Sequence, residues 1–279
     1  MIVSAHEVAE YYDNQQVFYS YLWSQTALHY GFWFDDTRTL AEALTNTDRV
    51  VADALHIEPD DRVLDAGCGV GGTSLYIAET TAARVDGITL SSVQLRIALA
   101  KAARSTAASR LSFSQQDFTS TLFDAGAFSK IFGIESISHA PNKIAFLDEA
   151  YRLLRPGGRL LICDGFLTAE NFAPDLRETY ERFLDGWALP NLATIADFRE
   201  SLTRAGFSQI TFHDMQRYIG RSIRRIYWHG VTTSIFSFIR ALSGSPRRDL
   251  AARHQKTLFA RGVMIYGFFT ADKPASEPK

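Results

Sequence analysis

The sequence predicts an α/β protein built on a doubly wound, mostly parallel sheet. Short apolar runs alternate with amphipathic stretches between residues 60 and 165, as they do when each strand is followed by a crossover helix. A glycine-rich turn follows the first of these runs. The length of 279 residues and a hydrophobic content of 46% are sufficient for one large core with additional helices.

The elements follow in order from the N-terminus. Aromatic residues are dense over residues 4–40, which predicts two short helices with a break at Gly31, forming a lid over the core. An amphipathic helix is expected at 40–55. Strands are then predicted at 62–65, 84–88, 111–114, 128–133 and 158–164, and helices at 73–80, 92–104 and 143–154.

The pattern changes after residue 164. Arg155 to Gly158 is expected to stop a helix and form a turn. Further helices are predicted at 175–187, 195–205, 217–241 and 247–259, and strands at 208–213 and 263–270. We therefore expect lid helices over residues 1–40 and a core over 41–279, with a helical cap inserted at about 166–260.

The turn at Val63–Gly72 carries the strongest functional signal. Asp65 ends an apolar run, and Gly67, Cys68 and Gly69 follow in the spacing D-x-G-C-G-x-G-G. Dinucleotide-binding turns have G-x-G-x-x-G instead, and a phosphate loop would need a Lys-Ser/Thr pair. This turn resembles the first motif of class I S-adenosylmethionine-dependent methyltransferases.

The resemblance extends over about residues 60–165. Gln116-Asp117-Phe118 follows the third predicted strand, and Leu154–Leu160 precedes the fifth. In that family an acidic residue after the third strand accepts the adenine amino hydrogen, so the resemblance assigns Gln116, Asp117 and Phe118 to the adenine side of the cofactor. It also implies a seven-stranded, Rossmann-like sheet whose last strand is antiparallel, and S-adenosylmethionine as the cofactor.

The residues at the end of the second predicted strand indicate which branch of the methyltransferases this chain resembles. Most class I methyltransferases carry an acid there that holds the ribose, but this chain has Thr89, and Asp86 lies three residues too early. The sequence G-I-T-L-S-x-x-Q is similar to the branch with cyclopropane synthases, sterol C24-methyltransferases and tocopherol methyltransferases. That similarity implies that Thr89 and Gln94 meet the ribose and methionine side of the cofactor.

A second narrow signal, Glu135 to Pro141, follows the fourth strand and looks like E-x-x-x-H-A/M-P of sterol and tocopherol enzymes. His139 is a candidate general base, since its ordinary pKa lies near neutrality. Glu135 is a second candidate base, or a partner of a developing cation or of His139. A purely structural role stays open for both residues.

The acceptor is expected to be small and mostly apolar. Tyr21, Trp33 and Trp187 are the predicted pocket residues, because aromatic faces stabilise a carbocation formed by methylation of an alkene. Deprotonation or cyclisation would follow on a prenyl, terpenoid or sterol-like acceptor. The alternatives are O- or N-methylation of a small metabolite, cofactor binding without catalysis, and nicotinamide oxidoreduction, which the turn spacing disfavours.

The net charge and the cysteine content limit the partners and the cellular compartment that we expect. A net charge of −2 gives no reason to expect nucleic acid or membrane surfaces as partners, and no apolar run is long enough for stable membrane insertion. Cys68 and Cys163 are expected to be buried thiols in a reducing compartment, with no metal site. We therefore expect a cytoplasmic enzyme that forms a homo-oligomer through its aromatic N-terminal segment.

Overall fold

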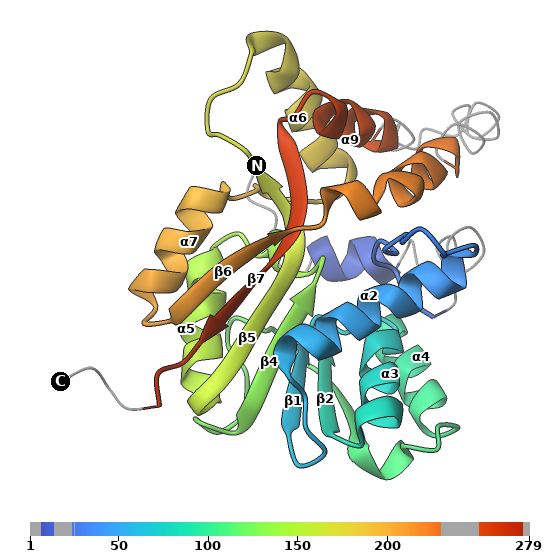
Figure 1. Ribbon diagram of the computed structural model, residues 1–279, viewed down its shortest axis with the longest axis vertical. Coiled ribbons are helices and arrows are strands. Elements are labelled where there is room, and N and C mark those ends of the chain that lie inside the picture. The colour runs from blue at the N-terminus through green and yellow to red at the C-terminus, as the bar shows by residue number, and fades with distance from the viewer. Residues whose placement is uncertain (1–6, 14–23, 25, 230–250, 276–279) are drawn as a thin grey trace.

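The computed structural model of the protein describes residues 7–13, 24, 26–229 and 251–275. In this part of the chain a seven-stranded sheet forms in the order β3-β2-β1-β4-β5-β7-β6 (Figure 1). The strands are β1 (Arg62–Ala66), β2 (Arg84–Thr89), β3 (Leu111–Gln115), β4 (Phe128–Ile134), β5 (Leu154–Leu167), β6 (Ser208–Asp214) and β7 (Met264–Asp272).

The strand directions confirm the predicted doubly wound, Rossmann-like sheet. β1 to β5 pair in parallel, and β7 runs antiparallel to both of its neighbours, β5 and β6. The chain passes from β1 to β2 and β3, and it then returns to β4 on the other side of β1. The carboxyl ends of β1 and β4 therefore border a topological switch point, where open α/β sheets bind ligands.

Helices cover both faces of the sheet (Figure 1). α2, α3 and α4 lie on one face and α5 and α7 on the other, each group closing its own apolar cluster. α6 and α9 pack against each other beyond the carboxyl ends of the strands. The bounds are α2 (Leu40–Leu55), α3 (Gly72–Thr81), α4 (Ser92–Ala102), α5 (Lys143–Leu153), α6 (Pro174–Gly186), α7 (Ile195–Arg204) and α9 (Ala251–Ala260), with further helical residues at 7–13 and 220–229.

Local sequence explains where α2 begins and which face it buries. Thr39 and Glu42 form a reciprocal capping box, an arrangement that stabilises a helix N-terminus by about 1 kcal/mol. Leu44, Val51 and Leu55 recur at helical spacing, and all three side chains are buried against the core. The predicted amphipathic helix at 40–55 is therefore confirmed.

The predicted pair of N-terminal helices is only partly correct. Residues 7–13 are helical, whereas residues 26–39 contain no helix. Their backbone groups bind partners far away in the sequence, as when the Tyr30 N–H donates to the Glu135 carboxylate at 2.7 Å. The second predicted helix is wrong because these long-range partners take the donors that a helix would use. We call residues 26–34 the strap.

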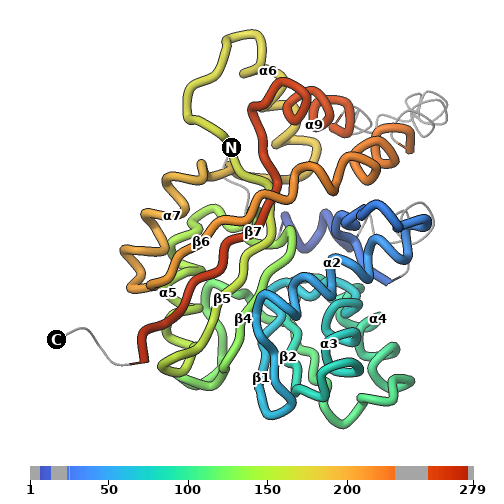
Figure 2. Tube along the Cα trace, viewed as in Figure 1, coloured from blue at the N-terminus to red at the C-terminus, as the bar shows by residue number. Residues whose placement is uncertain are grey.

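Two predictions around the later elements also need correction. The predicted turn Arg155 to Gly158 forms the irregular first part of β5, where the Gly157 N–H donates to the Lys273 carbonyl at 3.0 Å. The predicted helix at 217–241 begins as a 3-10 turn (Gln216–Tyr218) and is helical over 220–229. The rest of it lies outside the described residues. Figure 2 shows the trace leading from β6 into this helix, on the same side as α2.

No helix in the described part of the chain is long and apolar enough to cross a membrane. Residues 166–260 hold α6, α7 and α9, and they also hold β6, which joins the main sheet. The predicted division into lid, core and cap stays a prediction, as do the homo-oligomer and the cytoplasmic location.

Candidate active site

The glycine-rich turn closes against the end of β2. The N–H groups of Gly67 and Cys68 donate to the Ile88 carbonyl at 3.0 and 2.8 Å. Gly67 has φ of 100°, and a Cβ on it would lie 2.3 Å from the Cβ of Ser136. Glycine is therefore required here, because the loop after β4 packs directly on the turn.

Gly69 faces open space instead. Its φ is 52°, and a Cβ added to it would meet no described protein atom within 4 Å. α3 begins directly after the turn, at Gly72, and no described side chain caps its first N–H groups, which point towards the same edge of the sheet. The turn thus borders a space that a ligand can fill, with its backbone available at close range.

Asp65 is the buried acid at the start of the turn. The Ser74 hydroxyl donates to its carboxylate at 2.6 Å, and the residue is 3% exposed. Burial raises the pKa of Asp65 to about 7, although the hydrogen bond from Ser74 opposes the shift. A positively charged ligand nearby would favour the ionised form.

Thr89 and Gln94 lie together beside the turn, and their predicted contact with the ribose and methionine side of the cofactor stays a prediction. The Thr89 hydroxyl donates to Gln94 Oε1 at 3.1 Å, and both side chains are buried. Asp13, at the end of the N-terminal helical residues, accepts a hydrogen bond from the Ser91 hydroxyl and so binds that helix to this corner. Asp86 does point elsewhere, because its side chain pairs with an arginine on the solvent side.

The loop after β3 holds the predicted adenine-side residues. Asp117 Oδ1 accepts hydrogen bonds from the N–H and hydroxyl of Thr119, at 2.8 and 2.7 Å. The Gln116 amide donates to the Ser114 hydroxyl of β3 and accepts from the Leu122 N–H of the loop, and Phe118 is buried edge-on to a phenylalanine of α5. Among the described residues Asp117 Oδ2 takes no further hydrogen bond, so this oxygen is the one available to an amino group.

Glu135 stands directly after β4, with a left-handed backbone (φ of 50°) that a non-glycine residue seldom adopts. Its Oε1 accepts from the Tyr30 N–H and from the Tyr266 hydroxyl, both at 2.7 Å. Both of these bonds use Oε1, and no hydrogen bond within the described ranges reaches Oε2, which is therefore the oxygen that a ligand could meet. Burial raises the pKa of Glu135 to about 7, against the opposing effects of His29 and these hydrogen bonds.

His139 is held at both ring nitrogens. Nδ1 lies 3.2 Å from the Ala188 carbonyl, and Nε2 lies 2.8 Å from the Tyr12 hydroxyl. A carbonyl only accepts, so Nδ1 carries the proton and the Tyr12 hydroxyl donates to Nε2. Burial lowers the pKa of His139 to about 4, which keeps the ring neutral. Any proton reaching His139 in this arrangement would pass by way of Tyr12.

Asp164, which the sequence analysis did not select, supports this corner from the end of β5. Its carboxylate accepts from the Ser138 N–H at 2.9 Å and from the Gly165 N–H at 2.8 Å, and burial raises its pKa. It thereby fixes the turn that carries His139. A polar residue ending an apolar strand next to the switch point was the signal that could have revealed it.

The three predicted pocket residues have different outcomes. Trp33 donates from Nε1 to the Ser222 hydroxyl at 3.0 Å, so it fastens the strap to the helix at 220–229. Trp187 follows α6 and packs on the larger apolar cluster, and its Nε1 is buried without a partner among the described residues. Tyr21 lies outside the described residues. Whether these residues line the acceptor pocket stays a prediction.

The site therefore joins two halves at the carboxyl ends of the strands. One half is the glycine turn with Thr89, Gln94 and Asp117. The other half contains Glu135 and His139, surrounded by tyrosines from the N-terminal helix, the strap and β7. Tyr12, Tyr30 and Tyr266 belong to the second half. The first two lie in the predicted aromatic lid segment, whereas no pattern in the sequence was a reason to select Tyr266.

The family model described as mycolic acid cyclopropane synthetase matches residues 2–227. The chain belongs to this family. As a family member it is an S-adenosylmethionine-dependent methyltransferase, and the open space at Gly69 and the buried Thr89–Gln94 pair fit that cofactor. The predicted resemblance is thereby confirmed.

Curated relatives include both C- and O-methyltransferases. The chain is 25% identical to a sterol 24-C-methyltransferase of Kluyveromyces lactis over 271 residues, which is 96% of this chain and 70% of the relative. It is 27% identical to the chloroplastic tocopherol O-methyltransferase of Arabidopsis thaliana over 291 residues, 96% of this chain and 82% of the relative. The methylated atom therefore does not follow from membership.

Solved structures show the same fold. The [4+2]-cyclase SpnF superposes with a TM-score of 0.82 at 23% identity, covering 98% of each chain. Geranyl diphosphate C-methyltransferase from Streptomyces coelicolor, solved with geranyl diphosphate and S-adenosyl-L-homocysteine, gives a TM-score of 0.76 at 18% identity, covering 96% of this chain and 98% of the other. At these identities the likeness concerns the fold alone.

Proposed function

We propose that this methyltransferase methylates a carbon of an isolated alkene in a prenyl, terpenoid or sterol-like acceptor. The observation that supports the proposal most directly is Glu135. It is a partly buried carboxylate whose pKa is raised to about 7, and one of its oxygens is left for a ligand beside aromatic side chains. A base that changes protonation near neutral pH is suited to removing a proton from a carbocation.

Bound S-adenosylmethionine supplies an electrophilic methyl group. The alkene contributes its π-electron pair to the new C–CH₃ bond while the S–CH₃ bond breaks and its electron pair stays on sulfur, which would leave S-adenosyl-L-homocysteine and a carbocation on the neighbouring carbon. Aromatic ring faces can stabilise this cation without bonding to it, and the partly buried Trp33 and Trp187 are the side chains that we propose for this role. Glu135 then takes a proton from an adjacent carbon, and the C–H electron pair forms the new double bond. Capture of the cation by an internal π-bond would give a ring instead.

O- or N-methylation of a small metabolite is the second candidate, and the Tyr12–His139 pair favours it. A neutral imidazole that accepts from a tyrosine hydroxyl could receive the proton of an acceptor hydroxyl through that tyrosine. The low pKa of His139, about 4, makes this base weaker at neutral pH than Glu135. We therefore place this reaction second.

The test is transfer of a deuterated methyl group from the labelled cofactor to a matched pair of acceptors. One acceptor is a prenyl alcohol that carries an isolated alkene, and the other is a phenol of similar size without one. NMR of the purified product locates the label. We expect a new C–CD₃ bond on the alkene acceptor. Labelling only at oxygen would overturn alkene methylation in favour of the second candidate.

A further inference from the structure

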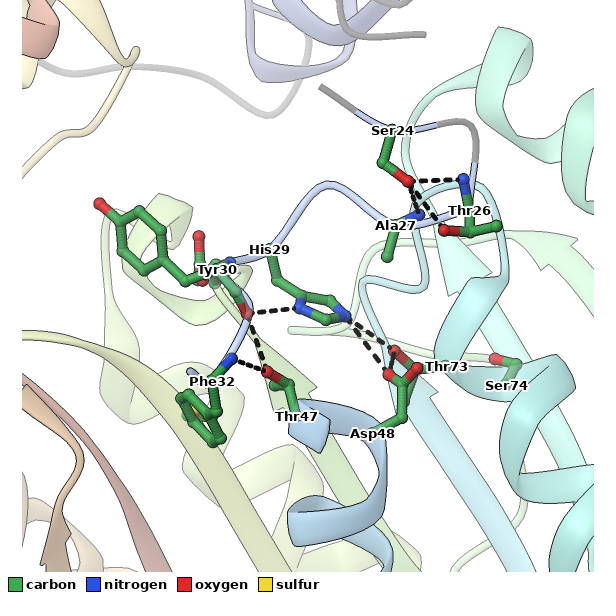
Figure 3. A network of polar contacts seen from close by, with 12 residues as sticks. Ser24, Thr26, Ala27, His29, Tyr30, Phe32, Thr47, Asp48, Thr73 and Ser74 are labelled. Carbon is green, nitrogen blue, oxygen red and sulfur yellow. Dashed lines mark hydrogen bonds and ion pairs between the residues drawn. The ribbon is translucent and has the colours of Figure 1, made fainter. Parts of the chain in front are cut away.

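A buried polar network fastens the strap to the core (Figure 3). His29 Nδ1 lies 2.9 Å from the Tyr30 carbonyl oxygen, and Nε2 lies 3.3 Å from both Asp48 Oδ1 and Thr73 Oγ1. The Thr73 hydroxyl donates to the same Asp48 oxygen at 2.7 Å. Because Asp48 belongs to α2 and Thr73 to the first turn of α3, the network reaches the helix that begins at the glycine turn.

The contacts of His29 in the described structure favour the protonated ring, an imidazolium. The Tyr30 carbonyl only accepts, so Nδ1 carries a proton. On the other side Nε2 meets the Asp48 carboxylate and the Thr73 oxygen, whose own proton is already given to Asp48. Nε2 therefore faces two acceptors and carries a proton as well. His29, which is 7% exposed, is thus a buried positive charge paired with Asp48.

Three acids surround this charge in the described structure. Asp48 comes from α2, Asp65 from β1 and Glu135 from the end of β4, while α3 contributes only the uncharged Thr73. Burial lowers the pKa of His29, but Asp48, followed by Glu135, raises it above 6.5 overall. In return His29 acts on Glu135, whose pKa it lowers against the larger effect of burial.

The strap links His29 to Glu135 mechanically as well. His29 donates to the carbonyl of Tyr30, and the N–H of the same Tyr30 donates to Glu135 Oε1 at 2.7 Å. The Thr47 hydroxyl also donates to that carbonyl, at 2.9 Å, so Tyr30 is held from the α2 side. A change at His29 therefore reaches Glu135 both through its charge and through the position of one backbone amide.

We propose that His29 is a positioning residue for Glu135. Its buried imidazolium supplies a charge that favours the ionised form of the Glu135 carboxyl, and its ring holds the Tyr30 peptide whose N–H orients that carboxylate. The inference rests on the proposed function, because it takes Glu135 as the base. Asp48 and Thr73 then have a definite role, which is to keep His29 protonated and in place beside the glycine turn.

The experiment compares His29→Asn with His56→Asn. His56 is an exposed residue that ends α2 and lies away from the strap contacts, so it controls for loss of a histidine. The acidic limb of kcat/KM reports ionisation of Glu135 in the free enzyme. We expect this limb to move roughly one unit to higher pH in His29→Asn, the size of a nearby-charge effect. It should stay in place in His56→Asn, and His29→Lys should move it back towards the wild-type position.

A purely structural role would lower kcat/KM by the same factor at every pH without moving the limb, and that result would overturn the proposal. If His29→Asn does not fold, ¹⁵N NMR of histidine-labelled wild-type protein at pH 7 still tests the proposal. A neutral His29 ring in that spectrum would contradict the proposed imidazolium. If no acceptor is methylated, the proposed function fails separately. Infrared spectroscopy then follows protonation of the Glu135 carboxyl as the pH changes, which tests the electrostatic link without turnover. We expect wild type and His29→Lys to give the same titration curve, because both keep a positive charge at this position.

Discussion

Replacing Gly69 by valine should weaken cofactor binding while the fold is largely retained. The backbone there has φ of 52°, so any side chain pays a left-handed strain of roughly 1–2 kcal/mol. In a domain of this size each kcal/mol lowers the Tm by roughly 2–4 °C. The new side chain meets no described protein atom within 4 Å, so packing adds little further cost. It would fill the space assigned to the cofactor, where an overpacking cost of roughly 1–3 kcal/mol weakens binding on the order of 5- to 150-fold.

Gly262→Val is the matched control for Gly69→Val. Gly262 has φ of 67° in the turn before β7, and a Cβ on it also meets nothing within 4 Å among the described atoms. The two variants therefore share the backbone strain and differ in location. Thermal denaturation should show similar losses of stability, whereas calorimetric titration with S-adenosylmethionine should show weaker binding only for Gly69→Val. Equal cofactor affinity in the two variants would refute the assignment of the turn.

Three further predictions concern the buried titratable groups. Glu135→Gln should lower turnover roughly 10²- to 10⁴-fold while cofactor affinity stays unchanged. His139→Ala should lower turnover by a smaller factor. Steady-state kinetics in which His139→Ala has the larger effect would favour O- or N-methylation. Because burial raises the pKa of Asp65 from 3.8 to about 7, the folded state loses stability as pH rises between these values, so Asp65→Asn should weaken this dependence and melt at a higher temperature at pH 8. If the Tm of Asp65→Asn falls between pH 4 and 7 as steeply as that of wild type, the buried Asp65 is not the cause of this pH dependence. The pKa of His29 is raised above 6.5, so its pairing with Asp48 stabilises the fold below that pH and is lost as pH rises through the folded value. The Tm gap between wild type and Asp48→Asn should therefore be wider at pH 6 than at pH 9, and a constant gap would count against the ion pair.

The sheet was predictable because its strands carry their own signals. β1 and β4 are short apolar runs that end at polar or glycine-rich turns, and the D-x-G-C-G motif can only serve a tight strand-to-helix connection. Thr89 and Gln94, which lie five residues apart across a strand end and a helix start, are hydrogen-bonded to each other, and their predicted contact with the cofactor stays a prediction. These features depend on neighbours in the sequence.

The acceptor side was less predictable because its contacts are remote in the sequence. Tyr12 meets His139 across 127 positions, and Tyr30 meets Glu135 across 105. No local pattern reveals such pairs, and none shows that burial moves the pKa values of Glu135 and His139 in opposite directions. For the same reason the strap looked helical from its aromatic content, although its donors bind partners elsewhere. The motif after β4 therefore predicted two candidate bases, Glu135 and His139, and only their buried surroundings in the structure show how their pKa values differ.

A crystal structure of the protein with S-adenosyl-L-homocysteine tests the central claim most directly. We predict an adenosyl group against the backbone of Gly69 and beside Thr89, its adenine amino group within hydrogen-bond distance of Asp117, and Glu135 Oε2 facing the acceptor side. Density for the ligand at any other edge of the sheet, or a turn at Gly69 closed by side chains, would contradict the account.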